Sequence, residues 1–125
     1  MIWLAIACGG ALGATARHAL NVAMHTGTAA RVPWSTFAAN ALGCLAIGLV
    51  AGLLASTRVH VGEIGRAFLV VGVLGGFTTF SAFGLDTLTL VRGGQGGLAA
   101  LNVAGQLVVG LSAVWLGYAV GTWRP

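Results

Sequence analysis

The sequence predicts an all-α membrane protein with four transmembrane helices, the third of which is broken at its centre. Of the 125 residues, 58% are hydrophobic and only 6% are charged, whereas a soluble domain has about a quarter charged residues. Four apolar segments each reach the ~20 residues needed to cross a ~30 Å hydrocarbon core. We therefore expect one domain over residues 1–125, with spans at about residues 2–22, 33–56, 67–91 and 98–122.

The first expected span combines small residues with one arginine. Gly9 and Gly13 are four residues apart, a spacing that lets a neighbouring helix approach closely, and similar glycine pairs occur in the other three spans. Arg17 lies toward the end of the span. It can extend its charge to the lipid headgroups, yet ionisable residues inside a membrane are functional candidates by default. The two interpretations are compatible, so Arg17 is a candidate site residue.

The second expected span contains a single asparagine, Asn40. An intramembrane asparagine commonly holds two helices together, a contact worth about 0.6 to 2 kcal/mol. Its two N–H donors are equally suited to an anion. Both interpretations stay open on the sequence alone.

The third expected span is interrupted by GGFTTFSAFG at residues 75–84. Adjacent glycines and two β-branched threonines weaken a helix, and in hydrocarbon each freed backbone group costs several kcal/mol unless protein or an ion satisfies it. The sequence therefore predicts a break that lines a cavity or binds something. Phe80 and Phe83 share a face if the helix resumes. They are either ordinary packing residues or aromatic rings whose weakly positive edges hold a small anion.

The fourth expected span carries Asn102 and Gln106 four residues apart, and therefore on one helix face. We expect a polar stripe there. The chain has only two acidic residues, Glu63 in a connection and Asp86 just after the phenylalanines. Asp86 is suited to relaying protons or binding a cation, or more simply to capping the helix or pairing with Arg92.

The charges bear on partners and on membrane orientation. The net charge of +4 comes from six arginines spread singly along the chain, so no basic patch indicates a nucleic-acid partner. With four spans, Arg58, Arg66 and Arg124 fall on the side of the termini, and Arg17, Arg31 and Arg92 fall on the other. A chain with so little bias can insert in both orientations, and two opposite copies can pair about an axis in the membrane plane. A chance balance is the alternative.

Catalytic motifs are missing from the sequence. It contains no HExxH, no GxxxxGK[ST] and no evident pairing of a nucleophile with a base, so we do not expect an enzyme.

Three motifs, in order along the whole chain, resemble the Fluc (CrcB) family of fluoride channels. They are GGALGATARH at 9–18, STFAANALGCLAIG at 35–48 and, most specifically, GGFTTFSAFGLDT at 75–87. The resemblance implies a fluoride-selective channel in the bacterial inner membrane that lowers cytoplasmic fluoride by passive efflux. It also implies an antiparallel, dual-topology homodimer in the lipid bilayer, with two pores and a central structural sodium ion (Na+).

The resemblance implies roles along the fluoride path. Phe80 and Phe83 would be the pore-lining rings, Asn40 would donate hydrogen bonds to the passing ion, and Arg17 would act at the aqueous vestibule.

The resemblance also implies a sodium site and a polar track. Backbone carbonyls of Gly75 and Thr78 would coordinate the sodium ion. The candidates for a polar track beside the rings are Ser81, Asn102 and Gln106. At Gln106 the family pattern leads us to expect a small hydroxyl residue, so this chain departs from it there.

Two other classes of function are the alternatives. A small proton-coupled exporter of the multidrug type has a similar length and number of spans, but that family relies on a carboxylate in its first span, and this chain has none there. The other alternative is a membrane accessory subunit without transport of its own.

Overall fold

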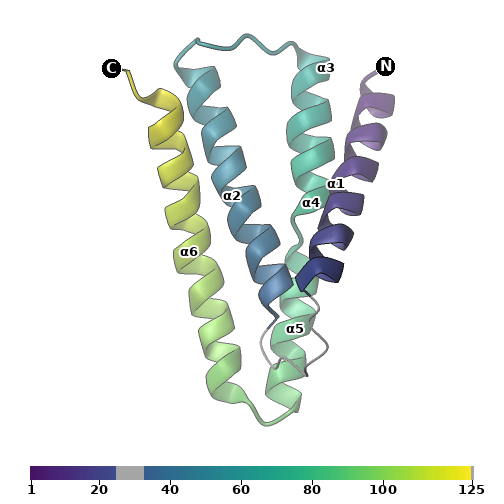
Figure 1. Cartoon of the computed structure of the whole chain (residues 1–125), viewed down its shortest axis with the longest axis vertical. Coiled ribbons are helices and arrows are strands. Elements are labelled where there is room, and N and C mark those ends of the chain that lie inside the picture. The colour runs from purple at the N-terminus through teal and green to yellow at the C-terminus, as the bar shows by residue number, and fades with distance from the viewer. Residues whose placement is uncertain (25–32, 125) are drawn as a thin grey trace.

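The computed structural model describes residues 1–24 and 33–124, and the fold is all-helical as predicted (Figure 1). Helix α1 spans Ile2–Met24 and α2 spans Trp34–Ala55. A long helical segment follows, made of α3 (Glu63–Arg66), the π-helix η1 (Ala67–Leu74), α4 (Gly75–Phe77) and α5 (Phe80–Arg92). Helix α6 spans Gly96–Thr122. The third helical segment thus begins at Glu63, four residues before the expected span, because α3 and η1 are continuous.

Within residues 1–24 and 33–124, three helical segments are long and apolar enough to cross a membrane: α2, the 30-residue segment Glu63–Arg92, and α6. Helix α1 has 23 residues, about 34 Å at ~1.5 Å per residue, but it carries Arg17 and His18 in its second half. That α1 also crosses stays a prediction from its length. The chain is a multi-pass membrane protein.

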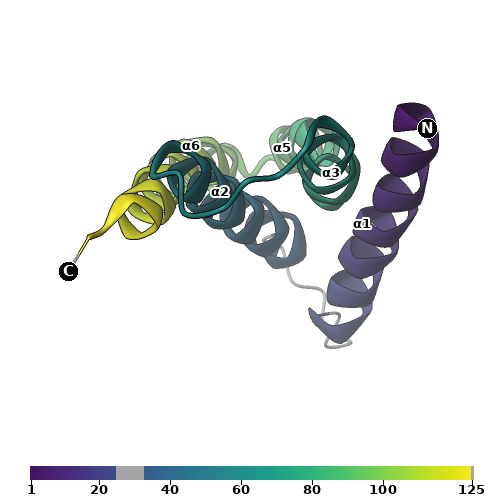
Figure 2. The same ribbon diagram turned by 90° about the horizontal axis from the view of Figure 1, so that it is seen from above.

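The termini and the connection between α2 and α3 lie at one end of the molecule, and the turn between α5 and α6 lies at the other (Figure 1). Seen from above, α1 lies beside α3, and α2 lies beside α6 (Figure 2). Arg58 and Arg124 therefore share an end with Arg66 of α3, and Arg92 ends α5 at the far side. Arg31 and the rest of the first connection lie outside the described residues. Arg58, Arg66, Arg124 and Arg92 thus lie at the ends where the sequence placed them, whereas Arg17 lies beside Gly76, near the middle of the third helical segment.

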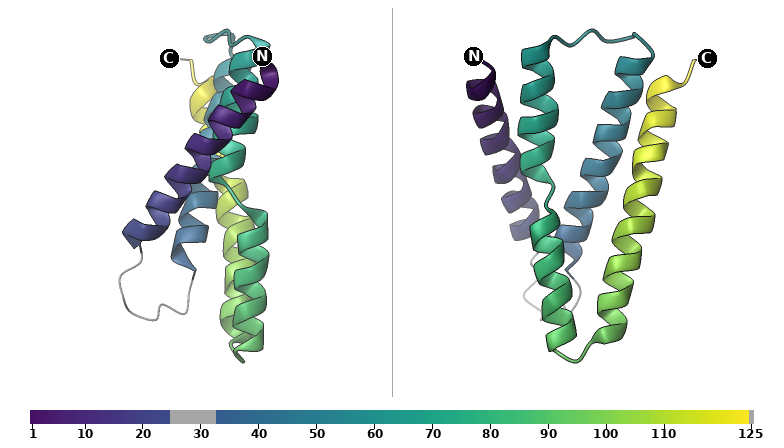
Figure 3. Two further views of the ribbon diagram at one scale, coloured as in Figure 1. Left: turned by 90° about the vertical axis from the view of Figure 1, so that its right-hand side faces the viewer. Right: turned by 180° about the vertical axis from the view of Figure 1, so that it is seen from behind.

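Glycines bring the helices together in two pairs. A Cβ atom added at Gly13 of α1 would meet the backbone of Val73 and Phe77, and one added at Gly48 of α2 would meet the backbone of Val114 on α6. Without a hydrophobic drive between helices in lipid, such close backbone approach is what associates them. Figure 3 shows the result, with α1 against the η1–α4 segment and α2 against α6. The glycines that make these contacts are Gly9, Gly13, Gly72 and Gly76 in the first pair, and Gly48, Gly52, Gly117 and Gly121 in the second.

The predicted break is present, and it falls at two threonines. Thr78 (φ −87°, ψ 159°) and Thr79 (φ −155°, ψ 114°) are extended, while Gly75 and Gly76 remain helical. The glycines are needed for packing: a Cβ atom at Gly76 would lie 2.6 Å from the Gly10 carbonyl oxygen of α1. The helix therefore gives way at the β-branched residues that follow.

One side chain from α2 satisfies the backbone at the break. The Thr79 N–H donates to Asn40 Oδ1 (2.8 Å), and Asn40 Nδ2 donates to the Thr79 carbonyl (3.1 Å). Thr79 Oγ1 then accepts the Ala82 N–H (3.1 Å) and caps the start of α5. Asn40 thus joins α2 to the broken segment, which is one of the two roles left open by the sequence, and its partner at the break is the Thr79 backbone.

Replacing Gly48 with alanine is expected to destabilise the protein by about 1–3 kcal/mol, because the new methyl group would meet the α6 backbone. The measurement is the shift of the unfolding curve when SDS is titrated into detergent micelles. Gly97→Ala is the control, since nothing lies within 4 Å of a Cβ atom there. Equal unfolding of both variants would show that α2 and α6 do not pack through Gly48.

Replacing Asn40 with leucine is expected to cost roughly 2–4 kcal/mol, because it leaves both the N–H and the carbonyl of Thr79 without a partner. The same SDS titration measures it. Asn21→Leu on the exposed face of α1 is the matched control. If Asn40→Leu unfolds at the same SDS concentration as the wild type, the break is held by contacts other than this pairing.

Candidate functional site

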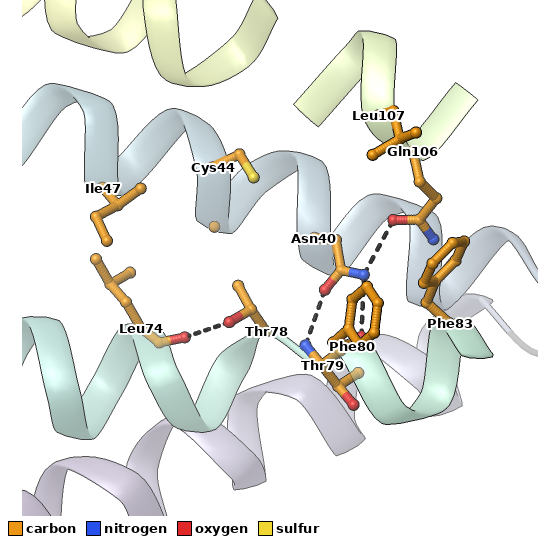
Figure 4. A pocket seen from close by; sticks show the side chains of 11 residues that line it. Asn40, Cys44, Ile47, Leu74, Thr78, Thr79, Phe80, Phe83, Gln106 and Leu107 are labelled. Atoms are coloured by element: carbon orange, nitrogen blue, oxygen red, sulfur yellow. Dashed lines mark hydrogen bonds between the residues drawn. The ribbon is translucent and has the colours of Figure 1, made fainter. Parts of the chain in front are cut away.

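A cavity of about 350 Å³ lies where α2, the break and α6 meet (Figure 4). Most of its lining is apolar, including Ile47, Leu74 and Leu107. Its polar and aromatic lining consists of Asn40, Thr78, Thr79, Phe80, Phe83 and Gln106. The structure thus brings together, from three helices, five of the residues that the sequence analysis singled out: Asn40, Thr78, Phe80, Phe83 and Gln106.

The two phenylalanines border this cavity as a tilted pair. Their ring centroids are 5.4 Å apart and their planes meet at 56°. Helix α5 restarts at Phe80, so the two rings lie one turn apart on one face, as their spacing predicted. Phe83 is partly buried, whereas Phe80 is 82% exposed in the single chain. Rings in this arrangement present polarised edges to a small ion.

The side-chain amide of Asn40 is hydrogen-bonded to other residues of the chain. Besides its two bonds to Thr79, its Nδ2 also donates to Gln106 Oε1 (3.0 Å). An asparagine amide has two N–H donors, so both are engaged. Asn40 lines the cavity, but in this arrangement neither of its N–H groups is free.

Gln106 completes this network on α6. Its Oε1 accepts from Asn40, while its Nε2 is buried and has no hydrogen-bond partner among the described residues. A buried donor left without a partner costs about 1–3 kcal/mol, which makes it a candidate for binding something else. Gln106 lies near the rings, as the resemblance implied, but the direction of its amide depends on Asn40, 66 residues away.

The break deprives several backbone carbonyls of their usual helical donors, and those of Gly75 and Thr78 are two of them. In a continuous helix the Thr79 N–H would bond Gly75, and the Ala82 N–H would bond Thr78. Here these N–H groups donate instead to Asn40 Oδ1 and Thr79 Oγ1. The carbonyls of Gly75 and Thr78 are thus released, and carbonyl oxygens are the donors that hard cations prefer. A sodium ion bound at the break would take these carbonyl oxygens as ligands.

Arg17 lies against the break from the other side. Its side chain is partly buried, and its Nε donates to the Gly76 carbonyl (3.2 Å). In an unbroken helix that carbonyl would accept from Phe80. The arginine therefore holds α1 to the end of α4.

The remaining polar-track candidates lie away from the cavity. Ser81 is exposed, and its hydroxyl bonds that of Thr79 (3.1 Å). Asn102 is 5% exposed and donates to Thr87 Oγ1 on α5 (2.9 Å). Of the expected stripe on α6, only Gln106 therefore reaches the cavity, while Asn102 joins α5 to α6.

Asp86 points into the protein. Its Oδ2 is buried and has no hydrogen-bond partner in the described part of the chain, so this oxygen makes neither the cap nor the Arg92 pair suggested above. Residues 1–24 and 33–124 also contain no group of three or more His, Cys, Asp and Glu side chains able to hold a metal ion.

Thr79 is the site residue that the sequence analysis missed. It accepts the Ala82 N–H at the start of α5, and a threonine just before an apolar helix is a known helix-start signal that would have identified it. Its pairing with Asn40 has no such signal.

Comparison with known proteins identifies the family. Residues 4–118 match the family described as "CrcB-like protein, Camphor Resistance (CrcB)". The chain is 51% identical over 120 residues to the "Fluoride-specific ion channel FluC" of Opitutus terrae, covering 94% of this chain and 89% of that protein. It is 50% identical over 117 residues to the protein of the same name from Novosphingobium aromaticivorans, covering 92% and 91%.

A third relative, the "Fluoride-specific ion channel FluC" of Methylobacillus flagellatus, is 46% identical over 114 residues, covering 90% of this chain and 88% of that protein. These similarities extend over nearly all of both sequences, and the matched residues 4–118 span the helices that form the cavity. The chain therefore belongs to the CrcB-like family.

Proposed function

We propose that this protein is a fluoride-selective channel through which fluoride leaves the cytoplasm passively. The observation that carries the proposal is the cavity at the break, where Phe80 and Phe83 lie beside amide groups inside a membrane helix bundle. Several weak contacts of this kind can replace the water shell of a small anion without trapping it. Relatives named as fluoride-specific channels, up to 51% identical, support the choice of ion.

The conducting unit in this proposal is an antiparallel homodimer with two pores. A single chain leaves Phe80 82% exposed, and among the described residues no large side chain is completely buried. A second copy would cover this apolar surface and close the cavity into a path. The near balance of arginines at the two ends supports opposite insertion of the two copies.

A sodium ion at the dimer centre would hold the two breaks together. Gly75 and Thr78 would supply backbone carbonyls from each chain, because both have lost their helical donors. When bound, the ion contributes positive charge and a fixed point between the chains.

The two alternatives lack a comparable feature. A proton-coupled exporter needs a titrating carboxylate, and α1 contains none. Asp86 is the one acidic residue within the described apolar helices away from their ends. An accessory subunit would need neither the ring pair nor the cavity.

Fluoride efflux from liposomes containing the purified protein tests the proposal. We expect passive, electrogenic efflux that needs no proton gradient and does not occur with chloride. No efflux, or efflux that depends on a proton gradient, would refute the channel.

Replacing Phe80 or Phe83 with isoleucine is expected to reduce fluoride efflux tenfold or more, with dimer assembly intact. Isoleucine keeps an apolar side chain but has no polarised ring edge. Phe68→Ile in η1, outside the cavity, is the control and is expected to conduct as the wild type does. Unchanged efflux in both ring variants would mean that the rings only pack.

Reporters fused to the carboxyl terminus are expected to appear on both sides of the membrane. The three arginines on the terminal side are matched by three on the other, so neither orientation is favoured. The measurement compares a reporter active in the cytoplasm with one active outside it. An Arg58→Gln, Arg66→Gln double variant should shift the population toward one orientation. A wild type found in a single orientation would contradict the antiparallel dimer.

A further inference from the structure

We infer that the side-chain donor which this cavity offers to fluoride is Gln106 Nε2, and that Asn40 is a positioning residue that aims it. The inference rests on the proposed function and assigns the two amides different tasks. It follows from which atoms of the Asn40–Gln106 network are already bonded and which one is not.

The orientation of Asn40 is fixed by the backbone. The Thr79 N–H can only donate, so the atom 2.8 Å from it must be the acceptor Oδ1. The Asn40 nitrogen is then the atom that faces the Thr79 carbonyl at 3.1 Å. Turning the amide over would set donor against donor and acceptor against acceptor.

The orientation of Gln106 follows from that of Asn40. The second N–H of Asn40 Nδ2 needs an acceptor, and the Gln106 atom 3.0 Å away must therefore be Oε1. This leaves Nε2 on the other side of the amide. The direction of the two N–H groups of Gln106 Nε2 is therefore set by Asn40, which is itself held by the Thr79 backbone.

That direction is toward the rings. Figure 4 shows the Gln106 amide nitrogen on the side of the cavity where Phe83 lies, and both residues line this cavity. Nε2 is buried and has no hydrogen-bond partner in the described part of the chain. It has therefore lost its hydrogen bonds to water without forming new ones within the protein. Phenyl edges and amide N–H groups both carry positive partial charge. Together they favour an anion and repel a cation.

A small anion suits this arrangement. Two N–H groups without a formal charge bind through short hydrogen bonds, which are stronger when the acceptor is ionised. The site therefore favours an ion with concentrated charge, such as fluoride, over larger halides. The absence of a full positive charge keeps the contact weak enough for the ion to leave.

Two substitutions at Gln106 distinguish the role of its Oε1 acceptor from that of its Nε2 donor. Gln106→Glu keeps an acceptor for Asn40 but replaces the N–H groups with oxygen, and Gln106→Met removes both ends. We expect each variant to assemble as a dimer in detergent and to carry fluoride out of liposomes tenfold more slowly or worse, the scale expected for losing a hydrogen bond to a charged partner. Gln95→Met at the start of α6, outside the cavity, is the control and is expected to conduct normally.

A measurement on the unmodified protein does not depend on whether the variants fold. The chain has two glutamines, Gln95 and Gln106, so labelling glutamine side chains with 15N gives one probe in the cavity and one internal control. Adding sodium fluoride to the dimer in lipid bilayers is expected to shift the Gln106 amide signal and leave that of Gln95 in place. Sodium chloride at the same concentration should shift neither.

The positioning role of Asn40 has its own signature. Asn40→Asp keeps an acceptor for the Thr79 N–H but loses the donor to Gln106, so the Gln106 signal should move without any fluoride present. Suppose that the wild type conducts fluoride, that Gln106→Met conducts equally well, and that fluoride does not shift the Gln106 signal. That result would refute this inference but would not contradict the proposed function. A wild type that conducts no fluoride would refute both.

Discussion

Thr79 is where the long membrane helix stops and restarts, and one side chain from another helix holds its backbone at that point. Because Asn40 takes the Thr79 N–H, the Gly75 carbonyl loses its helical donor, and because Thr79 caps α5, the Thr78 carbonyl loses one too. The remaining N–H of Asn40 fixes the Gln106 amide. A released pair of carbonyls, an oriented donor and a helix that restarts at Phe80 thus all depend on the pairing of Asn40 with Thr79.

Glycine contacts make that pairing possible, because they set how closely the helices approach. Gly48 and Gly117 bring α2 and α6 together, so that Gln106 comes within 3.0 Å of Asn40. Gly13 and Gly76 do the same for α1 and α4, and Arg17 reaches the Gly76 carbonyl as a result. Few large side chains are buried, and at these glycines the backbones of neighbouring helices come into direct contact. The geometry of the site therefore rests on residues that have no side chain of their own.

Much of this could be predicted from the sequence, for reasons that differ by residue. The apolar segments predicted the helices, and GGFTT predicted a break, because glycines and β-branched residues weaken a helix. The break falls at the threonines because packing against α1 occupies Gly76, a long-range contact with no local signal. The same limit applies to Arg17, which binds a carbonyl 59 residues away, and to the amide direction of Gln106. The shared face of Phe80 and Phe83 could be predicted because it follows from their spacing alone.

The claim that one asparagine holds an extended break open inside the membrane can be measured in the intact protein. Solid-state NMR of the 13C-labelled dimer in lipid bilayers reports backbone conformation through the Cα and Cβ shifts of Thr78 and Thr79. The account predicts extended-type shifts at both threonines, between helical shifts at Gly76 and Ala82. It further predicts a close contact between the Thr79 amide nitrogen and the Asn40 side-chain carbonyl carbon. Helical shifts at both threonines, with no such contact, would contradict it.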